Sequence, residues 1–148
     1  MGAADGGRIA PPVMPLRILI VEDDALTAAA FAAALNDAGH EVVAITDNGS
    51  AALGKAERTS ADLALIDITL RDGRTGLAAA RALHEDHVET VLVSGDINLR
   101  AKAESVQALG CMAKPADANQ VAQMVSNLAR NHAWAPRQSR VPVEDSSK

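Results

Sequence analysis

A short apolar run ends on an aspartate near the middle of the chain. Residues 63–67 read LALID, and a polar turn containing Gly73 follows soon after. Taken alone, Asp67 could simply start that turn, since aspartate is common in turns. A carboxylate at the end of a buried strand can also attack phosphorus and form an acyl phosphate. The residues that end the other apolar runs distinguish these two interpretations.

Three other apolar runs also end on polar residues that suit phosphoryl chemistry: Glu22, Asp23 and Asp24 after 16–21, Ser94 at the end of 90–94, and Lys114 at the end of 111–114. Crowded carboxylates repel one another unless a cation lies among them. Mg²⁺ prefers oxygen ligands and tends to serve phosphoryl chemistry, and metal and ammonium groups neutralise charge on a transferring phosphoryl group. Together these residue types predict phosphoryl transfer to Asp67.

These residues can meet only if the apolar runs lie side by side as strands. The expected strands are 16–21, 41–45, 63–67, 90–95 and 111–114, and the expected helices are 25–39, 50–59, 76–86, 98–110 and a last one from about Ala118. Gly39 is expected to end the first helix, and Asn48 could cap the second. The strands are apolar throughout, as in a parallel sheet covered by helices on both faces. Right-handed crossovers then give a doubly wound α/β sandwich, which binds ligands beyond the carboxyl ends of its strands.

Composition fits one intracellular domain. The chain has 148 residues, of which 48% are hydrophobic and 1% aromatic, so its core must consist of Ala, Leu, Val and Ile. The net charge of -5 does not suggest a nucleic-acid partner. The single cysteine, Cys111, excludes an internal disulfide and fits a reducing cytoplasm. No stretch suits a signal peptide or a membrane span. Residues 1–15 and 135–148 are expected to be flexible ends around a folded domain at 16–134.

Four motifs together resemble a known family. The segments ILIVEDD, LIDITLRDG, VLVSG and AKP stand in the order and near the spacing found in receiver domains of bacterial response regulators. The similarity extends from Leu16 to about His132. It implies a CheY-like, flavodoxin-like fold, with a five-stranded parallel sheet in the order 2-1-3-4-5 and five helices.

The resemblance also implies a role for each residue at the strand ends. Asp67 would be the phosphoacceptor, Ser94 the switch hydroxyl and Lys114 the partner of the phosphoryl oxygens, with a cis peptide before Pro115. The implied Mg²⁺ ligands are Glu22, acting mainly through water, together with Asp23, Asp67 and the backbone carbonyl of Thr69. The phosphodonor would be a phosphohistidine on a sensor histidine kinase or a histidine phosphotransfer protein. Such a switch catalyses only its own phosphorylation and dephosphorylation and is not otherwise an enzyme.

The expected output is a contact with another protein. After Trp134 the sequence is too short for a DNA-binding or catalytic output domain. We therefore expect a stand-alone receiver that signals through a downstream effector protein, without direct DNA binding or membrane contact. In this family the face made by the fourth helix, the fifth strand and the fifth helix usually binds partners, so the chain is expected to be a monomer or a homodimer through that face.

Two alternatives remain open, and one of them rests on a departure from the family pattern. Receivers usually carry an aromatic residue three positions before the lysine, and this chain has Cys111 there. The usual coupling between serine and aromatic side chain is therefore in question, and a pseudo-receiver that binds without being phosphorylated is one alternative. The other is a Mg²⁺-dependent phosphohydrolase of the haloacid dehalogenase type. That class needs a second aspartate two residues after the nucleophile, where this chain has Thr69.

Two charged segments have no predicted role in this chemistry. His84 and His87 are three residues apart, a spacing that could hold a metal ion on a helix. The sequence shows no third ligand nearby, so an exposed helix end is the expectation. Arg71 and Arg74 flank the loop after Asp67 and are expected to be solvated.

Overall fold

The structure is a computed structural model that describes residues 14–71 and 75–134. The two ends expected to be flexible lie almost wholly outside the described residues, as does Arg74. None of the described helices is both long enough and apolar enough to cross a membrane.

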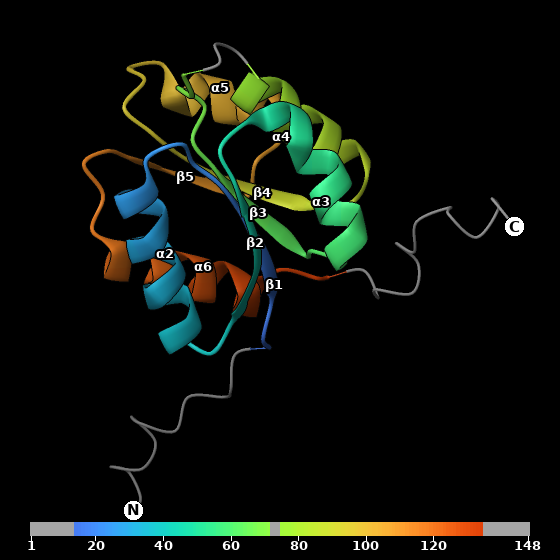
Figure 1. The fold of residues 1–148 in the computed structure, drawn as a ribbon, viewed down its shortest axis with the longest axis vertical. Coiled ribbons are helices and arrows are strands. Elements are labelled where there is room, and N and C mark those ends of the chain that lie inside the picture. Colours follow the sequence, from blue (N-terminus) through green and yellow to red (C-terminus); the bar gives the residue numbers. More distant parts are fainter. Residues whose placement is uncertain (1–13, 72–74, 135–148) are drawn as a thin grey trace, which may run out of the picture.

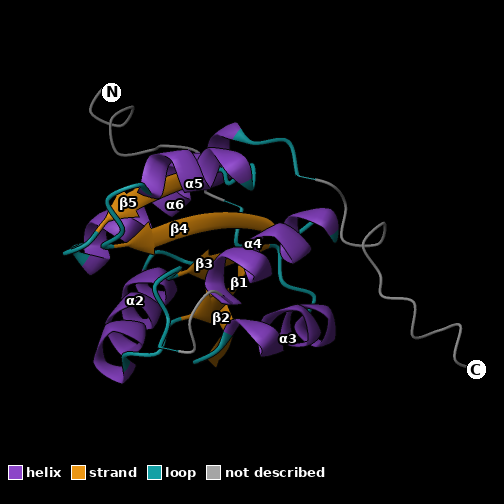
Figure 2. Cartoon of the chain, turned by 90° about the horizontal axis from the view of Figure 1, so that it is seen from above, coloured by secondary structure: helices purple, strands orange, loops and turns teal. Residues whose placement is uncertain are grey.

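Five parallel strands form one sheet in the order β2-β1-β3-β4-β5. The strands are β1 (Arg17–Val21), β2 (Glu41–Thr46), β3 (Leu63–Ile66), β4 (Glu89–Ser94) and β5 (Gly110–Ala113). Figure 2 shows them side by side, from β5 at the top to β2 at the bottom. The strand order and the parallel direction confirm the predicted doubly wound fold. Neighbouring strands β1 and β3 leave in opposite directions across the sheet, so their carboxyl ends mark its switch point.

Helices cover both faces of the sheet. They are α2 (Ala25–Asp37), α3 (Ala52–Thr59), α4 (Thr75–Glu85), α5 (Leu99–Ser105) and α6 (Ala118–Asn131), with a 3₁₀ turn η1 (Gly49–Ala51) before α3. One core lies between the sheet and the pair α2 and α6, and the other between the sheet and α3, α4 and α5 (Figure 1). The buried apolar side chains of the described residues are Ala, Leu, Val and Ile, with Phe31 as the single aromatic. This confirms the core expected from the composition.

Helix ends follow local side-chain chemistry. Asp24 precedes α2, and its carboxylate accepts a hydrogen bond from the Thr27 N–H at 2.9 Å. Asp117 caps α6 in the same way, through the N–H groups of Asn119 and Gln120. Asn48 accepts from the N–H of Ala51, so it caps η1 rather than α3 directly. These contacts satisfy backbone donors that have no partner inside a helix.

The expected helix over 98–110 is wrong at its carboxyl end. α5 stops at Ser105, and Gln107 has a φ of 58°, which interrupts helical geometry. Val106 follows the helix, but it is buried in the core. Its position therefore fits the apolar spacing of a helix although its backbone is in a turn. Gly110 begins β5 and does not end the helix.

A buried histidine ties the start of the sheet to α6. The His40 Nδ1 accepts a hydrogen bond from the Leu16 N–H at 3.2 Å, and its Nε2 lies 3.0 Å from the Ser126 hydroxyl. Because Nδ1 accepts, the ring is neutral and carries its proton on Nε2. Burial lowers the pKa of His40 below its ordinary value, which favours this neutral form.

Candidate functional site

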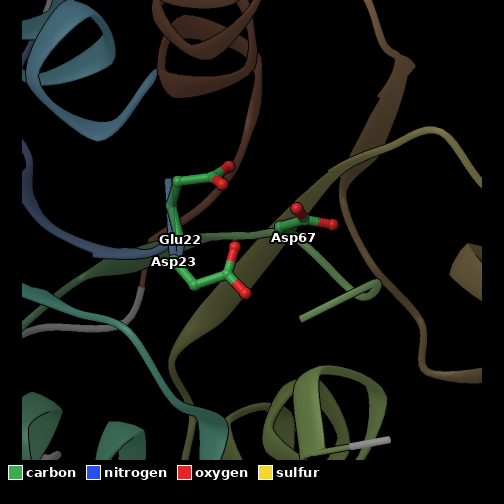
Figure 3. A group of neighbouring side chains, drawn as sticks. All are labelled: Glu22, Asp23 and Asp67. Carbon is green, nitrogen blue, oxygen red and sulfur yellow. The ribbon is translucent and has the colours of Figure 1, made fainter. Parts of the chain in front are cut away.

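Three carboxylates meet at the switch point of the sheet. Glu22 and Asp23 follow β1, and Asp67 follows β3 on the neighbouring strand (Figure 3). One oxygen from each lies within 4.8 Å of the others. Glu22 and Asp67 are only 4% and 5% exposed. Buried carboxylates this close need compensating positive charge.

The backbone fixes these side chains by extending the sheet hydrogen bonds beyond the strands. The Glu22 N–H donates to the Thr46 carbonyl of β2, and the Asp67 N–H donates to the Val21 carbonyl of β1, both at 2.9 Å. The side chain of Glu22 also accepts from the Asp24 N–H at 3.1 Å. Both acids therefore project from a rigid edge.

Lys114 reaches the cluster from the edge of the sheet that β5 forms. It follows β5, and its Nζ donates to Glu22 Oε1 at 2.8 Å and to Asp67 Oδ2 at 2.9 Å. The Lys114–Pro115 peptide is cis, as the resemblance implied. One ammonium thus bridges two of the three carboxylates. Among the described residues, Lys114 is the cation in direct contact with Asp67.

This bridge keeps both groups charged. Burial by itself raises the pKa of the Asp67 carboxyl, but hydrogen bonds from Lys114 and Thr69 outweigh burial and hold the pKa below its usual value. Burial by itself lowers the pKa of the Lys114 ammonium, but the hydrogen bonds to Glu22 and Asp67 more than compensate and raise the pKa. At neutral pH Asp67 is therefore an anion and Lys114 a cation.

Thr69 has a contact that the sequence did not reveal. Its N–H and its hydroxyl both donate to Asp67 Oδ1, at 2.8 Å and 2.7 Å. The sequence assigned Thr69 only a backbone carbonyl for a metal ion. A signal was present, because an aspartate often accepts from the backbone two residues later in a turn. Thr69 thus orients Asp67 while Lys114 holds its other oxygen.

Ser94 lies at the end of β4 and is fully buried. Its hydroxyl is 3.4 Å from the Thr69 hydroxyl and accepts from the Asp96 N–H at 3.2 Å. The Asp96 carboxylate accepts from Lys102 of α5 at 2.6 Å, and this contact lowers the pKa of Asp96. Ser94 is therefore linked both to the residue that orients Asp67 and to the loop that leads into α5.

Arg71 contributes through its backbone. Its N–H donates to Asp23 Oδ2 at 2.6 Å, whereas its guanidinium Nε is 3.9 Å from the same oxygen and the side chain is 81% exposed. The expectation of a solvated arginine side chain agrees with this exposure. The additional finding is that the loop after β3 folds back onto the acidic cluster through a main-chain hydrogen bond.

The arrangement suits a divalent cation with oxygen ligands. Glu22, Asp23 and Asp67 supply three carboxylates against the single ammonium of Lys114, so the cluster carries excess negative charge. The donors are all hard oxygen atoms, which Mg²⁺ prefers over nitrogen or sulfur. The residues present therefore fit Mg²⁺, and the predicted site residues at the ends of β1, β3, β4 and β5 lie together at one place.

Residues 18–126 of this chain match the family of response regulator receiver domains. The chain belongs to this family. The matched segment contains the site residues Glu22, Asp23, Asp67, Thr69, Ser94 and Lys114. The sheet order and the cis peptide agree with the fold that the resemblance implied.

Two relatives extend the comparison. The receiver is 30% identical over 104 residues to the transcriptional regulatory protein PdtaR of Mycobacterium tuberculosis, an alignment that covers 70% of this chain and 50% of that protein. It is 31% identical over 94 residues to a protein-glutamate methylesterase/protein-glutamine glutaminase of Archaeoglobus fulgidus, covering 64% of this chain and 27% of that protein. The chain thus spans half or less of the length of these relatives.

Solved receiver structures share the fold. The signal receiver domain of a modulated diguanylate cyclase from Desulfovibrio desulfuricans is 27% identical with a TM-score of 0.70, covering 80% of this chain and 96% of that one. A CheY-like receiver domain protein from Methanospirillum hungatei is 23% identical, also with a TM-score of 0.70 and the same coverage. The second likeness concerns the fold alone.

Cys111 lies within β5 of this receiver and is partly buried against the core formed with α3, α4 and α5. The small side chain replaces the aromatic residue expected at this position. A displacement of a large ring cannot report the state of this site, so any coupling to α5 must use other contacts.

Proposed function

We propose that this receiver accepts a phosphoryl group on Asp67 from a phosphohistidine and thereby switches its contact with a partner protein. One observation carries the proposal: Lys114 Nζ lies within 2.9 Å of Asp67 and of Glu22, beside a cluster that suits Mg²⁺. A nucleophile, a cation for the phosphoryl oxygens and a hard-metal site are then within reach of one another.

In the proposed reaction an oxygen of Asp67 forms a bond to phosphorus while the bond between phosphorus and the imidazole nitrogen of the donor breaks. The leaving imidazole takes up a proton and ends neutral. The lowered pKa of Asp67 keeps the nucleophile ionised. Lys114 and the Thr69 groups orient the carboxylate, and Lys114 then donates to the phosphoryl oxygens.

Glu22, Asp23, Asp67 and the backbone carbonyl of Thr69 would hold Mg²⁺. When bound, Mg²⁺ neutralises negative charge on the phosphoryl oxygens. Lys114 donates hydrogen bonds to two of these ligand residues, Glu22 and Asp67. The ion and the ammonium therefore compete for the same carboxylates.

The proposed switch begins at Ser94. To donate to a phosphoryl group on Asp67, its hydroxyl must turn from the Asp96 N–H, and this releases the loop that Asp96 and Lys102 connect to α5. Phosphorylation would bias two arrangements of the face formed by α5, β5 and α6. The small Cys111 makes the loop, and not a ring displacement, the carrier of this signal.

The proposed partners are proteins: a sensor histidine kinase or a histidine phosphotransfer protein as donor, and an effector that reads the α5-β5-α6 face. That face could also support a homodimer. We propose no direct DNA binding by the receiver. A cytoplasmic location is proposed because the single cysteine is free and kinases of this class phosphorylate inside the cell.

The pseudo-receiver alternative rests on Cys111, and the phosphohydrolase alternative on the combination of aspartate, lysine and metal site. Against the second, Thr69 stands two residues after Asp67, and its hydroxyl is bonded to Asp67. No carboxylic acid is therefore available at that position to protonate a leaving group. We propose that the chain has no catalysis beyond its own phosphorylation and dephosphorylation.

The test is intact-protein mass after incubation with acetyl phosphate and Mg²⁺. Wild type and Asp24→Asn should gain one phosphoryl group, whereas Asp67→Asn should gain none, and chelation of Mg²⁺ should abolish the adduct. Asp24→Asn is a matched control, since asparagine caps a helix as well as aspartate does. A folded wild type that gains no phosphoryl group from acetyl phosphate or from phosphohistidine donors would favour the pseudo-receiver. Repeated hydrolysis of a phosphate ester would favour the phosphohydrolase.

A further inference from the structure

A second cluster of metal-binding side chains lies at the opposite end of the sheet from Asp67. Glu89 begins β4, His84 is in the last turn of α4, and His132 directly follows α6. Glu89 Oε2 lies 3.0 Å from His132 Nε2, and Glu89 Oε1 lies 3.9 Å from His84 Nδ1. The two imidazoles therefore flank one carboxylate, and the three side chains come from three different elements.

The arrangement joins residues that lie far apart in the sequence. The sequence places His84 near His87 and shows no third ligand beside them. The fold supplies Glu89 and His132, the latter 48 residues after His84 in the chain. Crossing from α4 to β4 and from β5 to α6 brings them together, which spacing along the sequence cannot show.

His132 is held in place before any metal binds. Its ring packs edge-on against Trp134, with ring centroids 4.7 Å apart. The Trp134 indole N–H donates to the Ala129 carbonyl in the last turn of α6 at 3.1 Å. These contacts orient the Nε2 of His132 toward Glu89 and reduce the ordering needed for binding.

We propose that His84, Glu89 and His132 form a binding site for a divalent cation of the zinc class. Two imidazole nitrogens and one carboxylate are the donors found in open zinc sites, in which water takes the fourth position. Tetrahedral coordination at the usual bond lengths separates two ligand atoms by about 3.3 Å. His132 Nε2 and Glu89 Oε2, at 3.0 Å, lie close to this separation. His84 Nδ1 lies 3.9 Å from the other oxygen of Glu89, Oε1, so His84 must move to share one ion with them.

Binding requires the two imidazoles to come closer together. Among the described residues, the three carboxylates at the other end of the sheet are the group whose donor atoms already lie within 4.8 Å of one another. Because His132 is held against Trp134, the movement falls to His84, whose side chain is 35% exposed. The donors also differ from those at Asp67: imidazole nitrogen selects zinc-class ions, and an all-oxygen cluster selects Mg²⁺.

An ion bound here would join the ends of α4 and α6 to the start of β4. These helices lie on opposite faces of the sheet. The ion would therefore stabilise the folded chain across both layers, without touching the phosphorylation site.

The experiment titrates the full chain, without an affinity tag and with Cys111 reduced, with Zn²⁺ in the presence of saturating Mg²⁺. Trp134 is the single tryptophan, so its fluorescence reports events at His132, and calorimetry gives the stoichiometry. The variants His84→Gln, Glu89→Gln and His132→Gln remove one proposed ligand each. His87→Asn is the matched control, because His87 has a φ of 66° that asparagine tolerates.

We expect one Zn²⁺ per chain, a change in Trp134 fluorescence and a higher melting temperature. Each ligand variant should weaken binding by at least about tenfold, whereas His87→Asn should change the affinity by less than about twofold. Circular dichroism verifies that each variant is folded. Absence of stoichiometric binding would overturn the proposal. Binding that survives His132→Gln, or that falls equally in His87→Asn, would also overturn it and indicate adventitious surface chelation.

Discussion

Substituting alanine for each of two helical glycines, Gly76 and Gly54, tests how tightly α4 packs against the end of β3. A Cβ added at Gly76, the second residue of α4, would lie 2.5 Å from the Asp67 carbonyl oxygen and 2.7 Å from the Ile68 Cα. Both are backbone atoms, so neither can rotate away. A Cβ at Gly54 in α3 would instead meet the tip of the Arg58 side chain at 3.2 Å, and that side chain can move. Alanine should therefore have opposite effects at the two positions.

The magnitudes follow from two opposing contributions. Overpacking at Gly76 costs about 1–3 kcal/mol, and the gain in helix propensity from alanine offsets about 0.5–1 kcal/mol. Gly76→Ala should thus lower the free energy of unfolding by about 0.5–2 kcal/mol. Gly54→Ala keeps only the gain and should raise it by about 0.5–1 kcal/mol. At about 4 °C per kcal/mol, the melting temperatures should fall by about 2–8 °C and rise by about 2–4 °C, respectively.

Thermal and urea unfolding of both variants beside the wild type measure these shifts. The displaced Asp67 should also slow phosphoryl transfer in Gly76→Ala and leave it unchanged in Gly54→Ala. A Gly76→Ala protein as stable as wild type would refute the reasoning, because it would mean that α4 is free to move away from the site without cost. Destabilisation of Gly54→Ala would equally contradict the assigned packing of α3.

Three further substitutions test the buried polar contacts. Burial lowers the pKa of His40 from its ordinary 6.5. The contribution of His40 to the free energy of unfolding should therefore be complete above pH 6.5 and diminish as the pH falls below it. In urea unfolding, His40→Asn should lose less stability than wild type between about pH 7.5 and about pH 5.5. Lys114→Met should bind Mg²⁺ about three- to tenfold more tightly in calorimetry, because a competing cation is removed, yet form the phosphoryl adduct more slowly. Ser94→Ala leaves the Asp96 N–H without its acceptor and should lose about 1 kcal/mol in urea unfolding, while Asp67 still accepts the phosphoryl group.

For each substitution, one result would contradict the prediction. Equal pH dependence in wild type and His40→Asn would mean that His40 is not the titrating group. Unchanged Mg²⁺ affinity in Lys114→Met would mean that the ammonium does not compete for Asp67. Full stability of Ser94→Ala would mean that the Ser94–Asp96 hydrogen bond contributes nothing to the fold.

Most of the candidate site could be predicted because the carboxyl ends of parallel strands all lie at the same edge of the sheet. Once the apolar runs were interpreted as strands, the residues after them had to meet, whatever the sequence distance between Glu22 and Lys114. Local chemistry also determines where α2 begins, since the contact of Asp24 with Thr27 lies within one helical turn. The order of the strands came from the resemblance, because periodicity does not determine which strands are neighbours.

What could not be predicted depends on tertiary contacts. The spacing of apolar residues predicts a helix that continues past Ser105. Val106 fits that spacing because it is buried, although it lies in a turn and not in a helix. The pairing of Glu89 with His132 requires knowledge of where α6 ends relative to β4. The double donation of Thr69 to Asp67 is different, because it is local and turn chemistry can predict it.

The most direct test of the central claim locates the phosphoryl group on the chain. Borohydride reduces an aspartyl phosphate to homoserine, and mass spectrometry of peptides then identifies the reduced residue. After incubation with Mg²⁺ and acetyl phosphate, we expect homoserine at position 67 in wild type and in Asp24→Asn, and none without Mg²⁺. Homoserine at another acidic residue, or a phosphoryl adduct of Asp67→Asn as abundant as that of wild type, would contradict the assignment of Asp67 as the phosphoacceptor.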